Sequence, residues 1–174
     1  MKHFQKCMLM FCACMLLFSF VPVRATHRQG DEIVQVGDKL PRFSVVTTTG
    51  AQVSDSTLRG MPSVVVFFNT ECGDCRKELP VLQKLYEEVG SDVSFLCIGR
   101  KEPVQQVADF WQAQALTLPC APQPDRTIYE LFARRTIPRV YISDVSGVVR
   151  KVFVECVSER KLRRAIRKVC GEIF

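Results

Sequence analysis

Two cysteines separated by two residues are the strongest candidates for chemistry in this chain. Cys72 and Cys75 lie in the segment Glu-Cys-Gly-Asp-Cys-Arg, and a C-x-x-C pair where a strand meets a helix is typical of a thiol–disulfide redox site. In such a site one thiolate attacks a substrate disulfide, and the second thiol resolves the mixed disulfide that results. The spacing therefore predicts a redox-active dithiol.

The residues on either side predict how this dithiol is positioned. Residues 64–68 are a continuous run of valine and phenylalanine, which is typical of a strand buried on both faces. From residue 75 to Val89 apolar residues recur at three- and four-residue steps, and Gly90 is typical of a helix end. Cys72 is therefore expected at a helix N-terminus, where backbone N–H groups and the helix dipole stabilise a thiolate. We predict that Cys72 is the nucleophile and Cys75 the resolving thiol.

Two segments resemble a known family. Residues 67–80 resemble the active-site segment of the TlpA/ResA-like thiol–disulfide oxidoreductases of the thioredoxin superfamily, which are envelope-tethered or periplasmic. Residues 136–142, Thr-Ile-Pro-Arg-Val-Tyr-Ile, resemble the family's cis-proline segment and the strand after it. The resemblance extends from about Val36 to the C-terminus. It implies a thioredoxin-like α/β fold, with a central mixed sheet flanked by helices, an N-terminal β-hairpin and an inserted helix, and it implies no cofactor.

The resemblance also assigns roles to Ile137 and Pro138. It implies a cis bond before Pro138, a loop that lies against the dithiol, and an Ile137 backbone that pairs with an extended substrate segment. The alternative is an ordinary proline at the start of a strand.

Glu71 and Asp74 place negative charge beside the dithiol. These charges oppose the helix dipole and the neighbouring Arg76 and Lys77, which would otherwise stabilise the Cys72 thiolate. We therefore expect a reducing rather than a strongly oxidising couple. Asp74 also suits the first turn of a helix, where the dipole favours a carboxylate.

A buried acid beside the resolving cysteine is frequent in the family, and the sequence leaves two interpretations of its counterpart here. Glu102 lies just past the second predicted strand, around residues 93–98. A solvated loop residue is an equal interpretation of Glu102, and the proton transfer would then rely on water.

The N-terminus has the order of a secretory signal. Two lysines and a histidine precede an apolar run over residues 7–21, and Val-Arg-Ala at 23–25 offers small residues for a signal peptidase. The run is shorter than the roughly 20 residues of a spanning helix, so cleavage is favoured over an uncleaved membrane anchor. We predict a signal peptide at 1–25, a tether at 26–35 and one thioredoxin-like domain at 36–174, located in the periplasm or cell envelope.

Charge gives little indication of further partners. The chain has 24 basic and 18 acidic residues, a net charge of +6, and without residues 1–25 it has 21 basic residues and a net charge of +3. Many cations lie in residues 160–168, around an apolar stripe of Leu162, Ala165, Ile166 and Val169. This pattern predicts a solvated helix rather than a nucleic-acid or membrane surface.

The expected partners are disulfide-containing envelope proteins, apocytochrome c among them, and an upstream membrane electron donor. Membrane contact is expected only through residues 1–25 if they are uncleaved.

Three alternatives to a thiol–disulfide oxidoreductase remain. The pair could be a structural disulfide or half of a zinc site, but after residue 25 the chain has one histidine, His27, and no second C-x-x-C. A thiol peroxidase would carry Pro-x-x-x-Thr-x-x-Cys, and Val65 and Asn69 occupy those positions before Cys72. A redox-inert or metal-handling thioredoxin-like binding protein is the third alternative.

The other cysteines of the predicted domain are Cys97, Cys120, Cys156 and Cys170. Cys97 lies in an apolar strand and is expected in the core. Cys156 and Cys170 stand at the ends of the last strand and the last helix, too far apart for a disulfide. No second disulfide is predicted.

Overall fold

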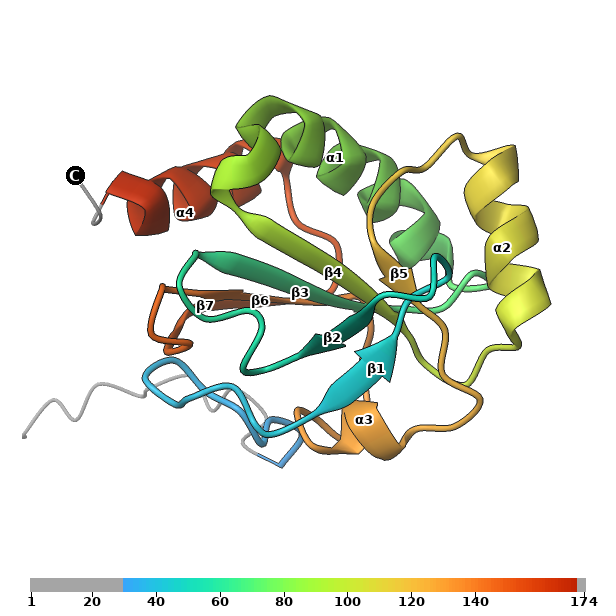
Figure 1. Cartoon of the computed structure of the whole chain (residues 1–174), viewed down its shortest axis with the longest axis horizontal. Coiled ribbons are helices and arrows are strands. Elements are labelled where there is room, and N and C mark those ends of the chain that lie inside the picture. The colour runs from blue at the N-terminus through green and yellow to red at the C-terminus, as the bar shows by residue number, and fades with distance from the viewer. Residues whose placement is uncertain (1–29, 172–174) are drawn as a thin grey trace, which may run out of the picture.

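The computed structural model describes residues 30–171, so the predicted signal peptide lies outside the described part of the chain. A five-stranded mixed sheet forms the centre of the domain, in the order β5-β4-β3-β6-β7, and a separate hairpin of β1 and β2 precedes it (Figure 1). The strands are β1 (Ser44–Val46), β2 (Gln52–Ser54), β3 (Ser63–Phe68), β4 (Ser94–Gly99), β5 (Cys120–Ala121), β6 (Arg139–Ser143) and β7 (Val149–Val154).

Between β3 and β6 helices alternate with strands along the chain, and α4 follows β7. They are α1 (Gly73–Val89), a 3₁₀ turn (Gly90–Asp92), α2 (Val104–Ala113), α3 (Thr127–Glu130) and α4 (Glu159–Gly171). The N-terminal hairpin and the inserted helix α2 confirm two predicted additions to a thioredoxin-like sheet, and the predicted fold class is confirmed.

The central strand β3 places the active-site segment. It pairs parallel with β4 and antiparallel with β6, so Val66 lies opposite Cys97 on one side and Val140 on the other. All six residues of β3 are buried. Such a strand needs apolar side chains on both faces, which explains its unbroken valine and phenylalanine run.

The two faces of β3 face different halves of the core. Val64, Val66 and Phe68 pack with α1, α2 and α4, whereas Val65 and Phe67 pack with the hairpin and the α3 region. Figure 1 shows α1 and α4 together over one face of the sheet and α3 below the other. The stripe predicted for the basic final helix is present, with Leu162, Ile166 and Val169 buried.

None of the helices within residues 30–171 is long and apolar enough to cross a membrane.

Candidate active site

Cys72 forms the N-cap of α1, at the point where the chain leaves β3. Its Sγ accepts the Cys75 backbone N–H at 3.4 Å, and its own amide donates to the Asn69 carbonyl at 3.1 Å. Cys72 is half-buried, Cys75 is fully buried, and both are free thiols. The predicted helix start is confirmed, and it places the Cys72 sulfur against an amide at the positive end of the helix dipole.

The second predicted motif lies against the first. The bond between Ile137 and Pro138 is cis, and the Cys72 thiol donates to the Ile137 carbonyl at an Sγ–O distance of 3.9 Å. The Pro138 carbonyl accepts the amide of Glu155 at 2.9 Å, which ties the cis-proline segment to the end of β7. Residues 65 positions apart therefore form one site.

A buried arginine contacts the cis-proline segment. Arg139 is 1% exposed, and its Nε donates to the Thr136 carbonyl at 2.9 Å. Its Nη1 lies 3.8 Å from a Glu32 carboxylate oxygen. Arg139 thus bonds to the start of the turn that carries Ile137, and its charge faces Glu32.

The Cys75 thiol is shielded from solvent. Burial raises the pKa of Cys75 above its usual range, and contacts with Cys72 and the charge of Glu78 raise it further. Cys75 therefore needs a nearby group to accept its proton before it can attack as a thiolate.

Glu78 is a site residue that the sequence prediction missed. It lies one turn after Cys75 on the buried face of α1 and is 1% exposed. Neither carboxyl oxygen has a hydrogen-bond partner within residues 30–171. Burial raises the pKa of Glu78 to about 7, the Asp74 charge adds to this, and the nearby Val157 amide and Cys156 thiol lower it without hydrogen bonds of good geometry. A carboxylate three residues after Cys75 on a mostly apolar helix face was the signal in the sequence.

Glu102 is buried as well, at 1% exposed, so its interpretation as a solvated loop residue is wrong. The loop after β4 turns inward because the Glu102 amide donates to the Gln123 carbonyl at 2.7 Å. Glu102 Oε1 accepts the Thr70 amide at 2.6 Å and the Thr70 hydroxyl, which also accepts Gln106 Nε2 at 2.8 Å. Burial raises the pKa of Glu102. This carboxylate holds the turn before Cys72 and is not the acid beside Cys75.

The two predicted tuning residues are both exposed. Asp74 accepts a hydrogen bond from Lys77 Nζ at 3.1 Å, and its charge raises the pKa of Glu78. The charge of Glu71 raises the pKa of Glu102. Their negative charges thus reach the two buried glutamates, and their influence on the redox couple stays a prediction.

The remaining cysteines of the described chain are free thiols. Cys97 and Cys120 face each other across β4 and β5 and are buried, which confirms Cys97 as a core residue. Cys156 is exposed and lies beside Glu78. Within residues 30–171, no three His, Cys, Asp or Glu side chains are grouped to hold a metal ion.

Known proteins match this domain over most of its length. The family model described as the AhpC/TSA family matches residues 36–152. The thioredoxin-like protein YneN of Bacillus subtilis is 24% identical over 144 residues, covering 81% of this chain and 84% of YneN. The thiol-disulfide oxidoreductase ResA of Bacillus cereus is 26% identical over 162 residues, covering 90% of this chain and 94% of that ResA.

Solved structures give the same result. A candidate protein disulfide isomerase from Bacteroides thetaiotaomicron superposes with a TM-score of 0.76 at 28% identity, covering 81% of this chain and 93% of the other. A thiol:disulfide interchange protein of the thioredoxin family from Chlorobium tepidum superposes with a TM-score of 0.70 at 25% identity, covering 79% and 99%. These matches confirm the predicted resemblance to ResA-like proteins.

Proposed function

The chain belongs to the AhpC/TSA family, and from this premise we propose that it is a thiol–disulfide oxidoreductase that reduces protein disulfides through Cys72 and Cys75. One observation carries the proposal. The Cys72 sulfur lies at the N-terminus of α1 between the Cys75 amide and the carbonyl that precedes the cis-proline. This arrangement supports a nucleophilic role for Cys72, a resolving role for Cys75 and a substrate-binding role for the Ile137 backbone.

In the first step the Cys72 thiolate attacks one sulfur of a substrate disulfide. The substrate S–S bond breaks, a mixed disulfide with Cys72 forms, and the departing substrate thiolate takes up a proton. The backbone of Ile137 pairs with the extended substrate segment beside the attacked sulfur, as edge pairing does in other peptide complexes.

In the second step Cys75 resolves the mixed disulfide. Glu78 accepts the Cys75 proton, because its carboxyl is buried one turn away and its pKa of about 7 suits a base near neutral pH. The Cys75 thiolate then attacks Cys72 Sγ and releases the second substrate thiol. The substrate gains two electrons, the enzyme keeps a Cys72–Cys75 disulfide, and an upstream electron donor must reduce it again.

The proposed location is the periplasm or cell envelope, with envelope proteins and apocytochrome c as substrates and a membrane protein as electron donor. Support comes from the basic, apolar and small-residue order of residues 1–25 and from the ResA-like resemblance.

The thiol peroxidase alternative has less support. The positions of its proline and threonine hold Val65, which is buried within β3, and Asn69, whose side-chain oxygen accepts the Glu71 amide at 3.0 Å. No hydroxyl from position 69 is therefore available to a peroxide beside Cys72.

Trapping of mixed disulfides tests the proposal. Cys75→Ala should leave the first attack intact and block resolution, so covalent complexes with substrate proteins accumulate on non-reducing gels of envelope extracts. Cys72→Ala should accumulate few such complexes, and Cys156→Ala serves as a matched control that removes an exposed thiol nearby. Mass spectrometry of the trapped partners names the substrates. Equal trapping by the Cys72 and Cys75 variants would contradict the assigned roles.

A further inference from the structure

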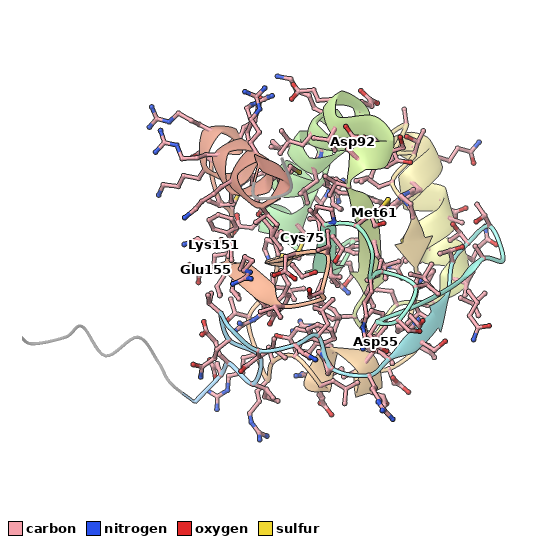
Figure 2. All side chains as sticks on the ribbon, turned by 60° about the vertical axis from the view of Figure 1, so that its left-hand side comes forward. Asp55, Met61, Cys75, Asp92, Lys151 and Glu155 are labelled. Atoms are coloured by element: carbon pink, nitrogen blue, oxygen red, sulfur yellow. The ribbon has the colours of Figure 1, made fainter. Side chains whose placement is uncertain are left out.

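A groove of about 890 Å³ lies between the edge strand β7 and helix α4. Figure 2 shows Lys151 on β7 and Glu155 directly after it at the edge of the molecule, beneath α4. The mechanism proposed above uses the dithiol and the cis-proline segment and assigns no task to this groove.

The groove is strongly basic. Five cations line it and no carboxylate does. Arg150 is paired with Asp144 at 2.6 Å. The other four are exposed and form no ion pair with any carboxylate of residues 30–171; they are Lys151, Lys161, Arg164 and Lys168. Unpaired like charges around one hollow attract a negatively charged ligand.

The floor of the groove is apolar and one wall is an open strand edge. Phe153 and Val169 line it from β7 and α4 and are half-buried and buried. The amide of Gly37 donates to the Val149 carbonyl, so the start of the β7 edge is covered. From Arg150 to Val154 that edge makes no backbone hydrogen bond to the described chain outside its ladder with β6. An open edge of this kind pairs with extended peptide.

The groove starts beside the dithiol. Val154, which lines it, pairs with Arg139, the residue directly after Pro138. Cys156 also lines it and lies beside Glu78. A protein joined to Cys72 therefore has its flanking chain within reach of the groove.

We infer that the β7–α4 groove binds an acidic, extended segment of the protein whose disulfide is reduced at Cys72, an assignment that rests on the proposed function. The segment adds to the β7 edge as a strand. Because successive side chains of a strand point to opposite faces of the sheet, every second residue of the segment faces the groove, and acidic residues at these positions meet the cations.

Other occupants fit these features less well. A second copy would bring the same cations to the interface and repel the first. Residues 1–29 contain no Asp or Glu, so the chain's own N-terminal segment has the wrong charge. A flat bilayer would meet the exposed lysines but not the recessed floor.

Direct binding tests the inference without any redox step. The probe is a cysteine-free fluorescent peptide that alternates valine or threonine with glutamate, and its partner peptide carries lysine instead. By anisotropy the purified protein should bind the glutamate peptide on the order of tenfold more tightly, given the usual strength of a few exposed ion pairs. The preference should disappear in Lys161→Glu/Lys168→Glu and persist in Arg42→Glu/Arg167→Glu, which makes the same charge change outside the groove. N-methylation of alternate peptide amides should weaken binding by removing strand pairing.

A redox assay then separates this inference from the proposed function. The reduced protein is given neutral hydroxyethyl disulfide and disulfide peptides with either acidic or basic tails. The wild type, the groove variant and the control variant should all reduce the neutral compound equally, and only the groove variant should lose the preference for acidic tails. If no disulfide is reduced, the proposed function fails, and the binding data still decide whether the groove takes an acidic strand. The inference would be overturned if the protein bound both peptides equally, or if the control variant lost the preference for the glutamate peptide to the same extent. It would also be overturned if phosphatidylglycerol vesicles or self-association of the protein displaced the acidic peptide.

Discussion

Helix α1 and the loop after β4 each bury one glutamate near the dithiol, and the two differ in their partners. Glu78 and Glu102 are both 1% exposed. Glu102 accepts the amide and the hydroxyl of Thr70, whereas neither oxygen of Glu78 has a hydrogen-bond partner within residues 30–171. Equal burial therefore supports two different tasks.

The difference follows from what a hydrogen bond does to a carboxyl group. Donors that point at Glu102 stabilise its charged form and fix its position. These hydrogen bonds hold the turn before Cys72. Glu78 accepts no hydrogen bond of good geometry from the nearby Val157 amide and Cys156 thiol, and burial raises its pKa to about 7. Near neutral pH it can both gain and lose a proton, which suits exchange with a buried thiol one turn away.

The largest expected effect comes from Glu78→Gln. Loss of the proton acceptor should slow the attack of Cys75 on the mixed disulfide by about 10² to 10⁴, the usual contribution of a general base, while the first attack by Cys72 stays unchanged. Stopped-flow release of thionitrobenzoate from Ellman's reagent in a Cys156→Ser/Cys170→Ser background separates the two steps. Glu102→Gln is the matched control and should retain fast resolution; equal slowing by both variants would remove the distinction between the two glutamates.

The second effect is on stability against pH. The folded pKa of Glu78, about 7, is raised from 4.5, so the folded protein binds more protons and loses stability as pH rises between these values. The loss totals about 3 kcal/mol, at 1.36 kcal/mol for each pH unit. Urea unfolding at pH 5 and pH 8 should show this decline in the wild type and a smaller one in Glu78→Gln, because the raised pKa of Glu102 contributes in the same direction. Glu71 is exposed, so the stability of Glu71→Gln should decline with pH as in the wild type. A wild type whose stability rises relative to Glu78→Gln over this range would contradict the assignment.

The sequence predicts the dithiol and the cis-proline but not the burial of the two glutamates. The dithiol, the start of α1 at Cys72 and the cis bond before Pro138 follow from local patterns and from the family resemblance, because each depends on a few adjacent residues. Burial of Glu78 depends on the Cys156–Val157 segment, which lies almost 80 residues away along the chain and packs across it. Neither carboxylate could be assigned to the dry interior before these distant segments were placed.

The third effect tests the structural task of Glu102. Glu102→Ala leaves the amide and hydroxyl of Thr70 without their acceptor and should lower the free energy of unfolding by about 1–3 kcal/mol. Glu102→Gln should recover part of this, because an amide oxygen still accepts a hydrogen bond. Urea unfolding at constant pH measures both. A Glu102→Ala protein of wild-type stability would show that the Thr70 contacts contribute nothing to holding the turn.

The smallest effect concerns Asp74, whose charge raises the pKa of Glu78 from the surface of the same helix. Asp74 is exposed and paired with Lys77 at 3.1 Å, so solvent and the lysine screen it. In Asp74→Asn the pH at which resolution reaches half its maximum should move down by less than about one unit, because removal of a nearby negative charge favours the ionised form of Glu78. The pH profile of the second thionitrobenzoate phase measures the shift, and added salt should reduce the difference from the wild type.

Glu71→Gln is the control, since Glu71 is not among the charges that act on Glu78, and it should leave the midpoint in place. An upward shift in Asp74→Asn would mean that Lys77, once released from Asp74, turns away from Glu78, or that a group other than Glu78 takes the Cys75 proton.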